Sequence, residues 1–133
     1  MSNCIFCDIS TRVASALIVY ENDKYICFLD KYPQTRGHLQ LIPKKHYEWI
    51  HELPSMGEIF ALAQKIIHGI IPVLGANHVS IGTFGQEVSH AHVWIVPRYH
   101  KGVRVKEGLG KKAKINDQIN LQAKLSRVLK EVY

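Results

Sequence analysis

The sequence predicts an α+β domain in which an antiparallel sheet of five strands packs against two main helices. Strand-like runs follow one another along the chain with short turns between them, which favours antiparallel pairing. Two longer segments place apolar residues at helical spacing. The chain has 133 residues and is 47% hydrophobic, which is ample for one core. We therefore expect a single domain over residues 1–133.

The first half of the chain predicts three strands. Residues 16–20 and 25–29 have strand-like composition, and the polar residues 21–24 between them predict a hairpin turn. A third strand is expected over residues 38–42, where Pro43 closes it.

A long helix is predicted after this strand. Leu53-Pro54-Ser55 indicates its start, and Pro72 should stop or kink it. The apolar residues between these points recur at helical spacing and should lie on the sheet as core: Ile59, Phe60, Ala63, Ile66, Ile67 and Ile70.

The second half of the chain predicts two more strands and a last helix. The strands are expected near residues 79–81 and over residues 90–96. Asn116 or Asp117 can cap the last helix. Its apolar residues form one stripe, so the helix must dock on the domain: Leu121, Leu125, Val128, Leu129 and Val132.

The run His-Ala-His-Val-Trp-Ile-Val-Pro at residues 90–97 is the most informative pattern in the chain. Alternate residues of a strand share a face, so His90, His92 and Trp94 would point the same way, about 6.6 to 7 Å apart. Two imidazoles so placed can serve one phosphate, metal or leaving group. A packed, hydrogen-bonded core pair is the alternative. The glycine-containing loop before the pair favours a reactive site on a strand that Pro97 ends.

The three cysteines are an odd number, which does not suit a secreted disulfide framework and fits a reducing compartment. Cys4 and Cys7 have the spacing of half a structural zinc site, whose other ligands would be Cys or His from elsewhere. A redox pair and two ordinary buried cysteines are the other interpretations. No apolar run approaches the roughly 20 residues that cross a bilayer. We expect a cytoplasmic protein that is not membrane-bound.

The formal net charge of +6 is concentrated near the C-terminus. Residues 1–97 carry seven Lys and Arg against eight Asp and Glu, whereas residues 98–133 carry ten against three. A basic C-terminal extension is therefore expected at about residues 99–133. It could contact nucleic acid or steer anionic ligands, although a solvated basic surface is the commoner explanation.

Five landmarks occur in order between residues 4 and 98: Cys4-Ile-Phe-Cys7, Phe28-Leu29-Asp30, Gly37-His38, Ile42-Pro43-Lys44-Lys45-His46, and Gly85-Gln86 leading to His90-Ala91-His92. Their order and spacing closely resemble those of the histidine-triad (HIT) family of nucleotide hydrolases and transferases. The resemblance implies a small α+β domain that usually forms a homodimer, with a nucleotide site on each protomer and no metal required for the chemistry.

The resemblance also implies catalytic roles. His92 would attack the α-phosphorus of a nucleotide, expel the leaving group and become a nucleotidyl-imidazole that water or another acceptor cleaves. A backbone carbonyl can fix the tautomer of such a ring and leave the other nitrogen able to attack. Gln86 and His90 are candidates for stabilising the phosphoryl oxygens. His38 falls where the family places a histidine near the nucleophile.

The resemblance implies binding roles as well. Asp30 would accept hydrogen bonds from ribose hydroxyls of a purine nucleotide or nucleotidyl adduct. Gln86, Glu87 and Trp94 would also contact the nucleotide. Four residues correspond to the apolar slot around the base, although core packing would suit them equally: Phe6, Ile9, Phe28 and Leu29.

Some family members bind zinc, and the corresponding residues here are Cys4, Cys7, His46 and His90. Two sulfurs and two nitrogens would form a closed site of structural type that supports the fold without taking part in the chemistry. His90 would then be a ligand whose other nitrogen could serve the active site.

Two residues depart from the family pattern. Trp94 replaces the third histidine of the triad, and an indole cannot shuttle protons. Protonation of the leaving group must then come from another residue or solvent, unless the leaving group needs no proton. Glu87 stands where relatives usually have Ser or Thr. Its carboxylate would repel a phosphate unless it is protonated or paired. It could instead act as a general acid or accept a hydrogen bond from an amine leaving group.

Three functions are compatible with these features. The first is a hydrolase that cleaves a phosphoramidate, a dinucleoside polyphosphate or a related nucleotidyl adduct through a nucleotidyl-histidine at His92. The second is a nucleotide-binding module with little turnover, because of Trp94 and Glu87. The third is an RNA or DNA binder that uses the basic extension.

Overall fold

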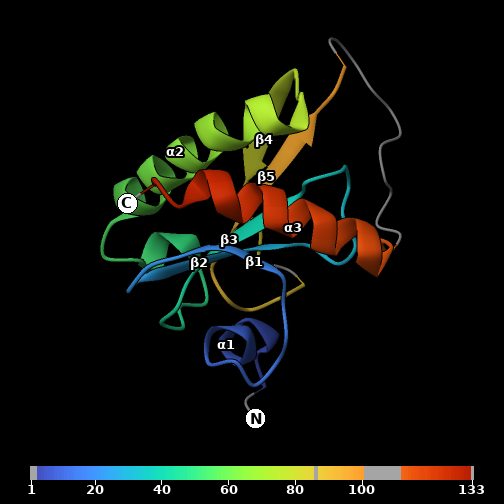
Figure 1. The fold of residues 1–133 in the computed structure, drawn as a ribbon. Helices are drawn as coiled ribbons and strands as arrows, with labels where there is room; N and C mark the ends of the chain where they lie inside the picture. The colour runs from blue at the N-terminus through green and yellow to red at the C-terminus, as the bar shows by residue number, and fades with distance from the viewer. Residues whose placement is uncertain (1–2, 86, 101–111, 133) are drawn as a thin grey trace.

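A computed structural model describes residues 3–85, 87–100 and 112–132. Five strands form one antiparallel sheet in the order β1-β2-β3-β5-β4. The strands are β1 (Ile18–Glu21), β2 (Tyr25–Leu29), β3 (Leu39–Pro43), β4 (His78–Gly82) and β5 (Val93–Arg98). Helices α2 (Met56–Leu74) and α3 (Ile115–Leu129) lie on one side of the sheet, and the short helix α1 (Ile5–Ser10) lies on the other (Figure 1). The predicted α+β fold is confirmed.

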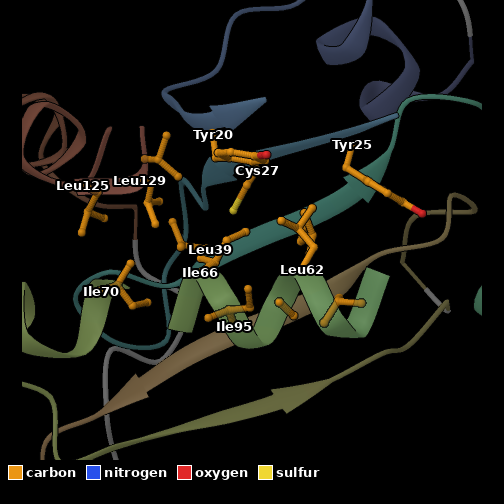
Figure 2. Close-up of a cluster of buried hydrophobic side chains, with 14 of the residues drawn as sticks. Tyr20, Tyr25, Cys27, Leu39, Leu62, Ile66, Ile70, Ile95, Leu125 and Leu129 are labelled. Carbon is orange, nitrogen blue, oxygen red and sulfur yellow. The ribbon is translucent and has the colours of Figure 1, made fainter. Parts of the chain in front are cut away.

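The strands contribute side chains to two cores because both faces of the sheet are covered. In β2, Tyr25, Cys27 and Leu29 belong to the core beneath α2 and α3, whereas Ile26 and Phe28 belong to the core beneath α1. This alternation is the period of two expected of a strand. The larger core is filled from both sides, with Leu39 and Ile95 from the sheet facing residues of α2 and α3 (Figure 2).

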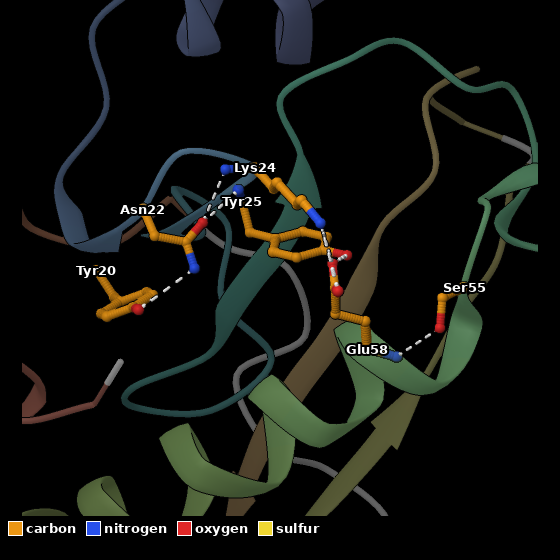
Figure 3. Close-up of polar contacts among 6 residues, drawn as sticks. All are labelled: Tyr20, Asn22, Lys24, Tyr25, Ser55 and Glu58. Carbon is orange, nitrogen blue, oxygen red and sulfur yellow. Dashed lines mark hydrogen bonds and ion pairs between the residues drawn. The ribbon is translucent and has the colours of Figure 1, made fainter.

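The predicted hairpin forms between β1 and β2. The side-chain oxygen of Asn22 accepts hydrogen bonds from the backbone N–H groups of Lys24 and Tyr25, at 2.9 and 2.8 Å, and so closes the turn (Figure 3). The Tyr25 hydroxyl donates to the Glu58 carboxylate at 2.6 Å. Burial and this carboxylate raise the pKa of Tyr25. The hairpin is thereby tied to the first turn of α2.

Helix α2 begins as the sequence predicts and extends further than predicted. Ser55 accepts a hydrogen bond from the backbone N–H of Glu58, an N-cap. The helix continues past Pro72 to Leu74 and ends at Gly75, whose left-handed backbone suits a glycine. Among the described residues, α2 is the one helix long and apolar enough to cross a bilayer by length and composition. One of its faces packs on the sheet, as in a core helix.

Several predicted boundaries differ from those observed. β3 ends at Pro43 itself, whereas β5 continues past Pro97 to Arg98. The strand predicted over residues 90–96 begins only at Val93. The strand predicted from His38 begins at Leu39.

Two helical elements have no strong sequence signal. Helix α1 has six residues, and the 3₁₀ turn Ile50–Glu52 has three. Neither is long enough to show a helical period. Helix α1 begins where the Cys4 sulfur accepts a hydrogen bond from the backbone N–H of Cys7, at 3.4 Å. A thiol is an unusual N-cap residue, so the usual start signal is missing.

The last helix docks as expected, although its predicted cap is wrong. Helix α3 begins at Ile115 after Lys114, which makes no side-chain capping bond, and Asn116 and Asp117 lie in the first turn. The helix packs against β1 and α2. Residues 112–129 of the basic extension are therefore part of the domain, whereas residues 101–111 lie outside the described residues. Contact with nucleic acid stays a prediction.

Replacing Leu125 by alanine should test whether α3 belongs to the cooperative core. Leu125 is fully buried, whereas Ile119 on the same helix is 46% exposed. We expect Leu125→Ala to lower the free energy of unfolding by about 2–5 kcal/mol and Ile119→Ala to change it by less than about 0.5 kcal/mol. Urea denaturation measures both. Equal effects of the two substitutions would show that α3 is not part of this core.

Candidate functional site

The histidine segment lies immediately before β5 and is fixed by hydrogen bonds outside the sheet. The backbone N–H of Ala91 donates to the carbonyl of Tyr47 at 2.7 Å instead of to a neighbouring strand. The Thr83 hydroxyl donates to the backbone carbonyl of His92 at 2.6 Å. These contacts explain why the strand begins only at Val93. They also hold the backbone on both sides of His90 and His92.

His92 is buried, with 4% of its surface exposed, and it forms part of the wall of a cavity. Its Nδ1 lies 2.9 Å from the carbonyl oxygen of His90. Because a carbonyl can only accept, Nδ1 carries the proton in the neutral ring and Nε2 carries the lone pair. The Phe6 ring lies edge-on to the imidazole, with centroids 5.8 Å apart. The predicted tautomer of His92 is therefore the one that its hydrogen bond selects.

His90 is fully buried, and its ring contacts a backbone carbonyl and the two cysteine sulfurs. Its Nε2 lies 2.8 Å from the carbonyl oxygen of Pro43, so Nε2 is the protonated nitrogen. Its Nδ1 lies 3.3 Å from the sulfur of Cys4 and 3.5 Å from that of Cys7. Both ring nitrogens thus have partners within the protein, and a direct role of His90 in catalysis stays a prediction. His90 acts on His92 through its backbone carbonyl.

The four residues expected to bind zinc lie together. Their ligand atoms are all within 4.8 Å of one another: Cys4, Cys7, His46 and His90. The sulfur of Cys7 also lies 3.2 Å from Nδ1 of His46. They come from the start of α1, the loop after β3 and the segment before β5, which are far apart in sequence.

The donor set fits a tetrahedral metal ion. Bonds of about 2.0–2.3 Å to nitrogen and sulfur separate the ligands of a tetrahedral zinc by roughly 3.3–3.8 Å, close to the observed separations of Cys7 from His46 and His90. Burial lowers the pKa of His90, which keeps its ring neutral and able to bind a metal. Burial, together with the Cys4 thiol, raises the pKa of Cys7 to about 11. A cation bound at this cluster would stabilise the deprotonated form of Cys7, the thiolate, over the thiol.

A cavity of about 550 Å³ opens beside His92 on the face of the sheet that α1 covers. Its walls include every described residue that was expected to bind the nucleotide: Phe6, Ile9, Phe28, Leu29, Asp30, Glu87 and Trp94. Gln86, expected in both catalytic and binding roles, lies outside the described residues.

Asp30 is held at the cavity wall by three contacts. Its side chain accepts from the backbone N–H of Tyr32 and from Nε2 of Gln40, both at 2.8 Å. Its backbone carbonyl accepts from Nε2 of Gln118 on α3, at 2.9 Å. The carboxylate remains partly exposed to solvent. Gln40 and Gln118 were not recognised from the sequence, because an isolated glutamine carries no motif.

His38 is fully buried and does not line the cavity. Its Nδ1 accepts a hydrogen bond from the backbone N–H of Gln34 at 3.1 Å, so its Nε2 carries the proton. Nε2 lies 3.8 Å from Oδ2 of Asp30. Burial lowers the pKa of His38, and the Asp30 charge opposes that shift. We interpret His38 as a support for Asp30 and Trp94 rather than a group that touches a ligand.

Trp94 is half-buried and packs within an aromatic cluster. Its ring lies edge-on to His38, with centroids 4.7 Å apart, and edge-on to Phe84, at 5.0 Å. Phe84 is 54% exposed at the cavity wall, a position that sequence reasoning did not recognise. Glu87 is exposed at the same wall.

Gly85, in the loop between β4 and His90, lies close to the side chain of Trp49. A Cβ atom added to Gly85 would lie 2.3 Å from a ring carbon of Trp49, so a larger residue there would require the Trp49 ring to shift.

Comparisons with known proteins agree with this site. The model of the HIT domain matches residues 11–101. An uncharacterized HIT-like protein of Methanocaldococcus jannaschii is 36% identical over 97% of this chain and 98% of its own length. Adenylylsulfatase HINT3 of Arabidopsis thaliana is 31% identical over 73% of this chain, which spans about half (53%) of that longer protein. The crystal structure of a Zn-bound histidine triad family protein from Mycobacterium smegmatis superposes with a TM-score of 0.77, at 29% identity, covering 96% of this chain and 93% of that one.

Proposed function

The chain belongs to the histidine triad family, and on that premise we propose that it is a hydrolase that cleaves a purine nucleotidyl adduct through a covalent intermediate on His92. The observation that carries the proposal is the hydrogen bond from His92 Nδ1 to the His90 carbonyl, at a ring that lines the cavity. It leaves the Nε2 lone pair as the nucleophile.

The proposed reaction has two steps. Nε2 of His92 bonds to the α-phosphorus while the bond from phosphorus to the leaving group breaks. Water then attacks the nucleotidyl-imidazole, which releases a nucleoside monophosphate, returns the ring to its starting state and delivers a proton to solvent. Catalysis of phosphoryl transfer depends largely on positioning and on electrostatic stabilisation. The contacts that hold His92 from Thr83 and His90 support the positioning.

The cavity walls suggest how the nucleotide binds. We place the base against Phe6, Ile9 and Phe28, and the ribose beside Asp30, whose carboxylate accepts hydrogen bonds from hydroxyls. Leu29 also lines the cavity, although its side chain belongs to the core beneath α2 and α3. Glu87 and Trp94 then lie on the part of the wall left for the phosphate and leaving group.

The identity of residue 94 bears on which leaving group departs. The Trp94 indole cannot act as a general acid that protonates a leaving group. Its ring packs against those of His38 and Phe84. An amine leaving group must gain a proton, whereas sulfate departs as a stable anion. We therefore propose that the preferred adduct has a leaving group that needs no proton. The name of the Arabidopsis relative, an adenylylsulfatase, is consistent with this class.

We also propose a zinc ion on Cys4, Cys7, His46 and His90. The donor set supports it, as does the Zn-bound relative. Bound there, zinc would supply structural cross-linking between α1 and the two histidine segments. It would also favour the Nε2-protonated form of His90, whose N–H donates to Pro43.

A homodimer is the proposed assembly. The edge of the sheet at β1 is covered by α3, and Gln122 of that helix donates to the carbonyl of Ile18. The other edge is β4, where Ile81 is 44% exposed. An edge strand with an exposed apolar side chain suits pairing with a second copy of the chain.

A nucleotide-binding module with little turnover is the second candidate, and Trp94 is the observation that favours it. This candidate predicts that purine nucleotides bind and that no product forms from any adduct over long incubation.

Replacing His92 by asparagine should abolish turnover. We expect kcat/KM for adenylyl sulfate, a dinucleoside polyphosphate and an adenosine phosphoramidate to fall by on the order of 10³-fold or more, because the nucleophile is lost. Intact-mass measurement after rapid quenching should detect an adenylyl adduct on the wild-type protein and none on His92→Asn. His68→Asn, at an exposed histidine of α2, is the matched control. Equal rates for wild type and His92→Asn on every substrate would reject the mechanism.

Replacing Trp94 by histidine should alter the dependence on the leaving group. An imidazole can protonate an amine, so we expect Trp94→His to raise kcat/KM for the phosphoramidate by roughly 10²-fold and that for adenylyl sulfate by much less. Trp94→Phe, which supplies no acid, should show no such gain. Steady-state kinetics measures the ratio of kcat/KM for the phosphoramidate to kcat/KM for adenylyl sulfate. A wild-type protein that already prefers the phosphoramidate would contradict the proposal.

Removing the metal should destabilise the domain. We expect elemental analysis to find about one zinc per chain. A chelator should lower the melting temperature, and added zinc should restore it. A ligand present at a thousand times its Kd stabilises by about 4 kcal/mol. Because Cys7 must lose a proton, metal binding should strengthen as pH rises. Cys7→Ser should lose the zinc and Cys27→Ala should retain it. Zinc content unaffected by Cys7→Ser would place the metal elsewhere.

A further inference from the structure

Phe84 is an exposed aromatic residue at the cavity wall, and Gly82 makes room for its ring. A Cβ atom added to Gly82 would lie 3.1 Å from Cζ of Phe84 and 3.3 Å from its Cε2. The Phe84 ring therefore occupies the space beside a side chain at residue 82. Gly82 pairs with Trp94 in the sheet, and directly paired residues share a face. The Phe84 ring thus lies on the face of the sheet that carries the Trp94 indole.

Phe84 and Trp94 together form an aromatic shelf. Their ring centroids are 5.0 Å apart, with an angle of 67° between the ring planes. His38, which is fully buried, packs against Trp94 with centroids 4.7 Å apart. Both rings of the shelf line the cavity, and 54% of the Phe84 surface is exposed. The shelf is therefore supported by the protein and still open to a ligand in the cavity.

The shelf lies across the cavity from the proposed slot for the base. Phe28, Gln40 and Trp94 are paired in a row across β2, β3 and β5, so Phe28 and Trp94 are two strand spacings apart, about 9.4–9.8 Å. His92 is two residues before Trp94 and lines the same cavity. With the base at Phe28 and the α-phosphorus at His92, the shelf is left for the group that departs from phosphorus.

The charges of the cavity wall restrict this leaving group. Among the described residues of the wall, Asp30, Lys31 and Glu87 are charged, and two of the three are acidic. A polyphosphate would bring several negative charges close to these carboxylates, which would repel it. A leaving group with a single negative charge and an aromatic body is a better match for the shelf.

We propose that Phe84 and Trp94 form a subsite for an aromatic ring on the leaving group, and that the adduct is a mixed anhydride of a nucleoside monophosphate with an aromatic carboxylic acid. Nε2 of His92 bonds to the α-phosphorus, and the electron pair of the broken phosphorus–oxygen bond leaves with the carboxylate. A carboxylate departs as a stable anion, so it needs no proton from Trp94. Water then cleaves the nucleotidyl-imidazole as in the proposed reaction. The inference rests on the proposed function and adds Phe84 as a specificity-determining residue.

The test compares two substrates that differ in the ring of the leaving group. Benzoyl adenylate and acetyl adenylate share the nucleotide and the anhydride. The benzoyl-to-acetyl ratio of kcat/KM is measured for the wild-type protein and divided by the same ratio for Phe84→Ala. The intrinsic reactivity of each anhydride cancels in this double ratio. We expect a value of roughly three to ten, because Phe84→Ala removes an aromatic contact with the benzoyl group only.

Further measurements separate a specific contact from damage to the site. Phe84→Tyr keeps the ring and should give a double ratio near one, as should Ile119→Ala, at an exposed position of α3. The kcat/KM of Phe84→Ala for acetyl adenylate should stay close to that of the wild type, because His92 is unchanged.

The outcomes distinguish failure of this inference from failure of the proposed function. A double ratio near one for Phe84→Ala, with both anhydrides cleaved faster by the wild type than by His92→Asn, would overturn the shelf alone. Wild-type rates no higher than those of His92→Asn on both anhydrides would overturn the proposed function, and the inference with it.

Two other outcomes would assign Phe84 a different role. Equal losses on both anhydrides, together with loss of a dimer in sedimentation, would make Phe84 a contact between copies of the chain and overturn the subsite. If Phe84→Ala lowers kcat/KM for diadenosine triphosphate relative to ATP and leaves benzoyl adenylate unchanged, the shelf binds a second nucleobase and the aromatic acid is excluded.

Discussion

The site depends on one chain of hydrogen bonds that passes through His90. The carbonyl of Pro43 fixes the His90 ring, and the carbonyl of His90 fixes the His92 ring. The first bond presents Nδ1 of His90 to the cysteine sulfurs, and the second leaves Nε2 of His92 with the lone pair. Because one residue serves both neighbours, the sulfur-containing cluster and the candidate nucleophile cannot be positioned independently.

Much of the fold could be predicted because its signals are local. The hairpin turn at Asn22, the N-cap at Ser55 and the alternation in β2 each reflect a rule that acts over a few residues. The errors arise where tertiary contacts override such rules. The strand start moves to Val93 because Ala91 bonds to Tyr47, and α1 depends on a thiol cap that local rules do not anticipate.

The candidate site was predictable where residue type and order carry the chemistry, as for Cys4, Cys7, His46 and His90. It was not predictable where the role depends on which atom of a side chain faces which neighbour. The sequence does not indicate that Nε2 of His90 faces the carbonyl of Pro43 while its Nδ1 faces the cysteine sulfurs. Gln40 belongs to the same class, because only the direction of its amide distinguishes it from a residue of the sheet interior.

Helix α1 joins two parts of the molecule that the sequence presents as separate motifs. Within six residues and its cap it carries Cys4 and Cys7 of the sulfur-containing cluster together with Phe6 and Ile9 of the cavity wall. Thermodynamic linkage makes any energetic coupling through this helix reciprocal: the factor by which a cation alters affinity for a nucleotide is the factor by which the nucleotide alters affinity for the cation. Through such coupling, a change in cation occupancy at the cluster would change the affinity of the cavity for its ligand.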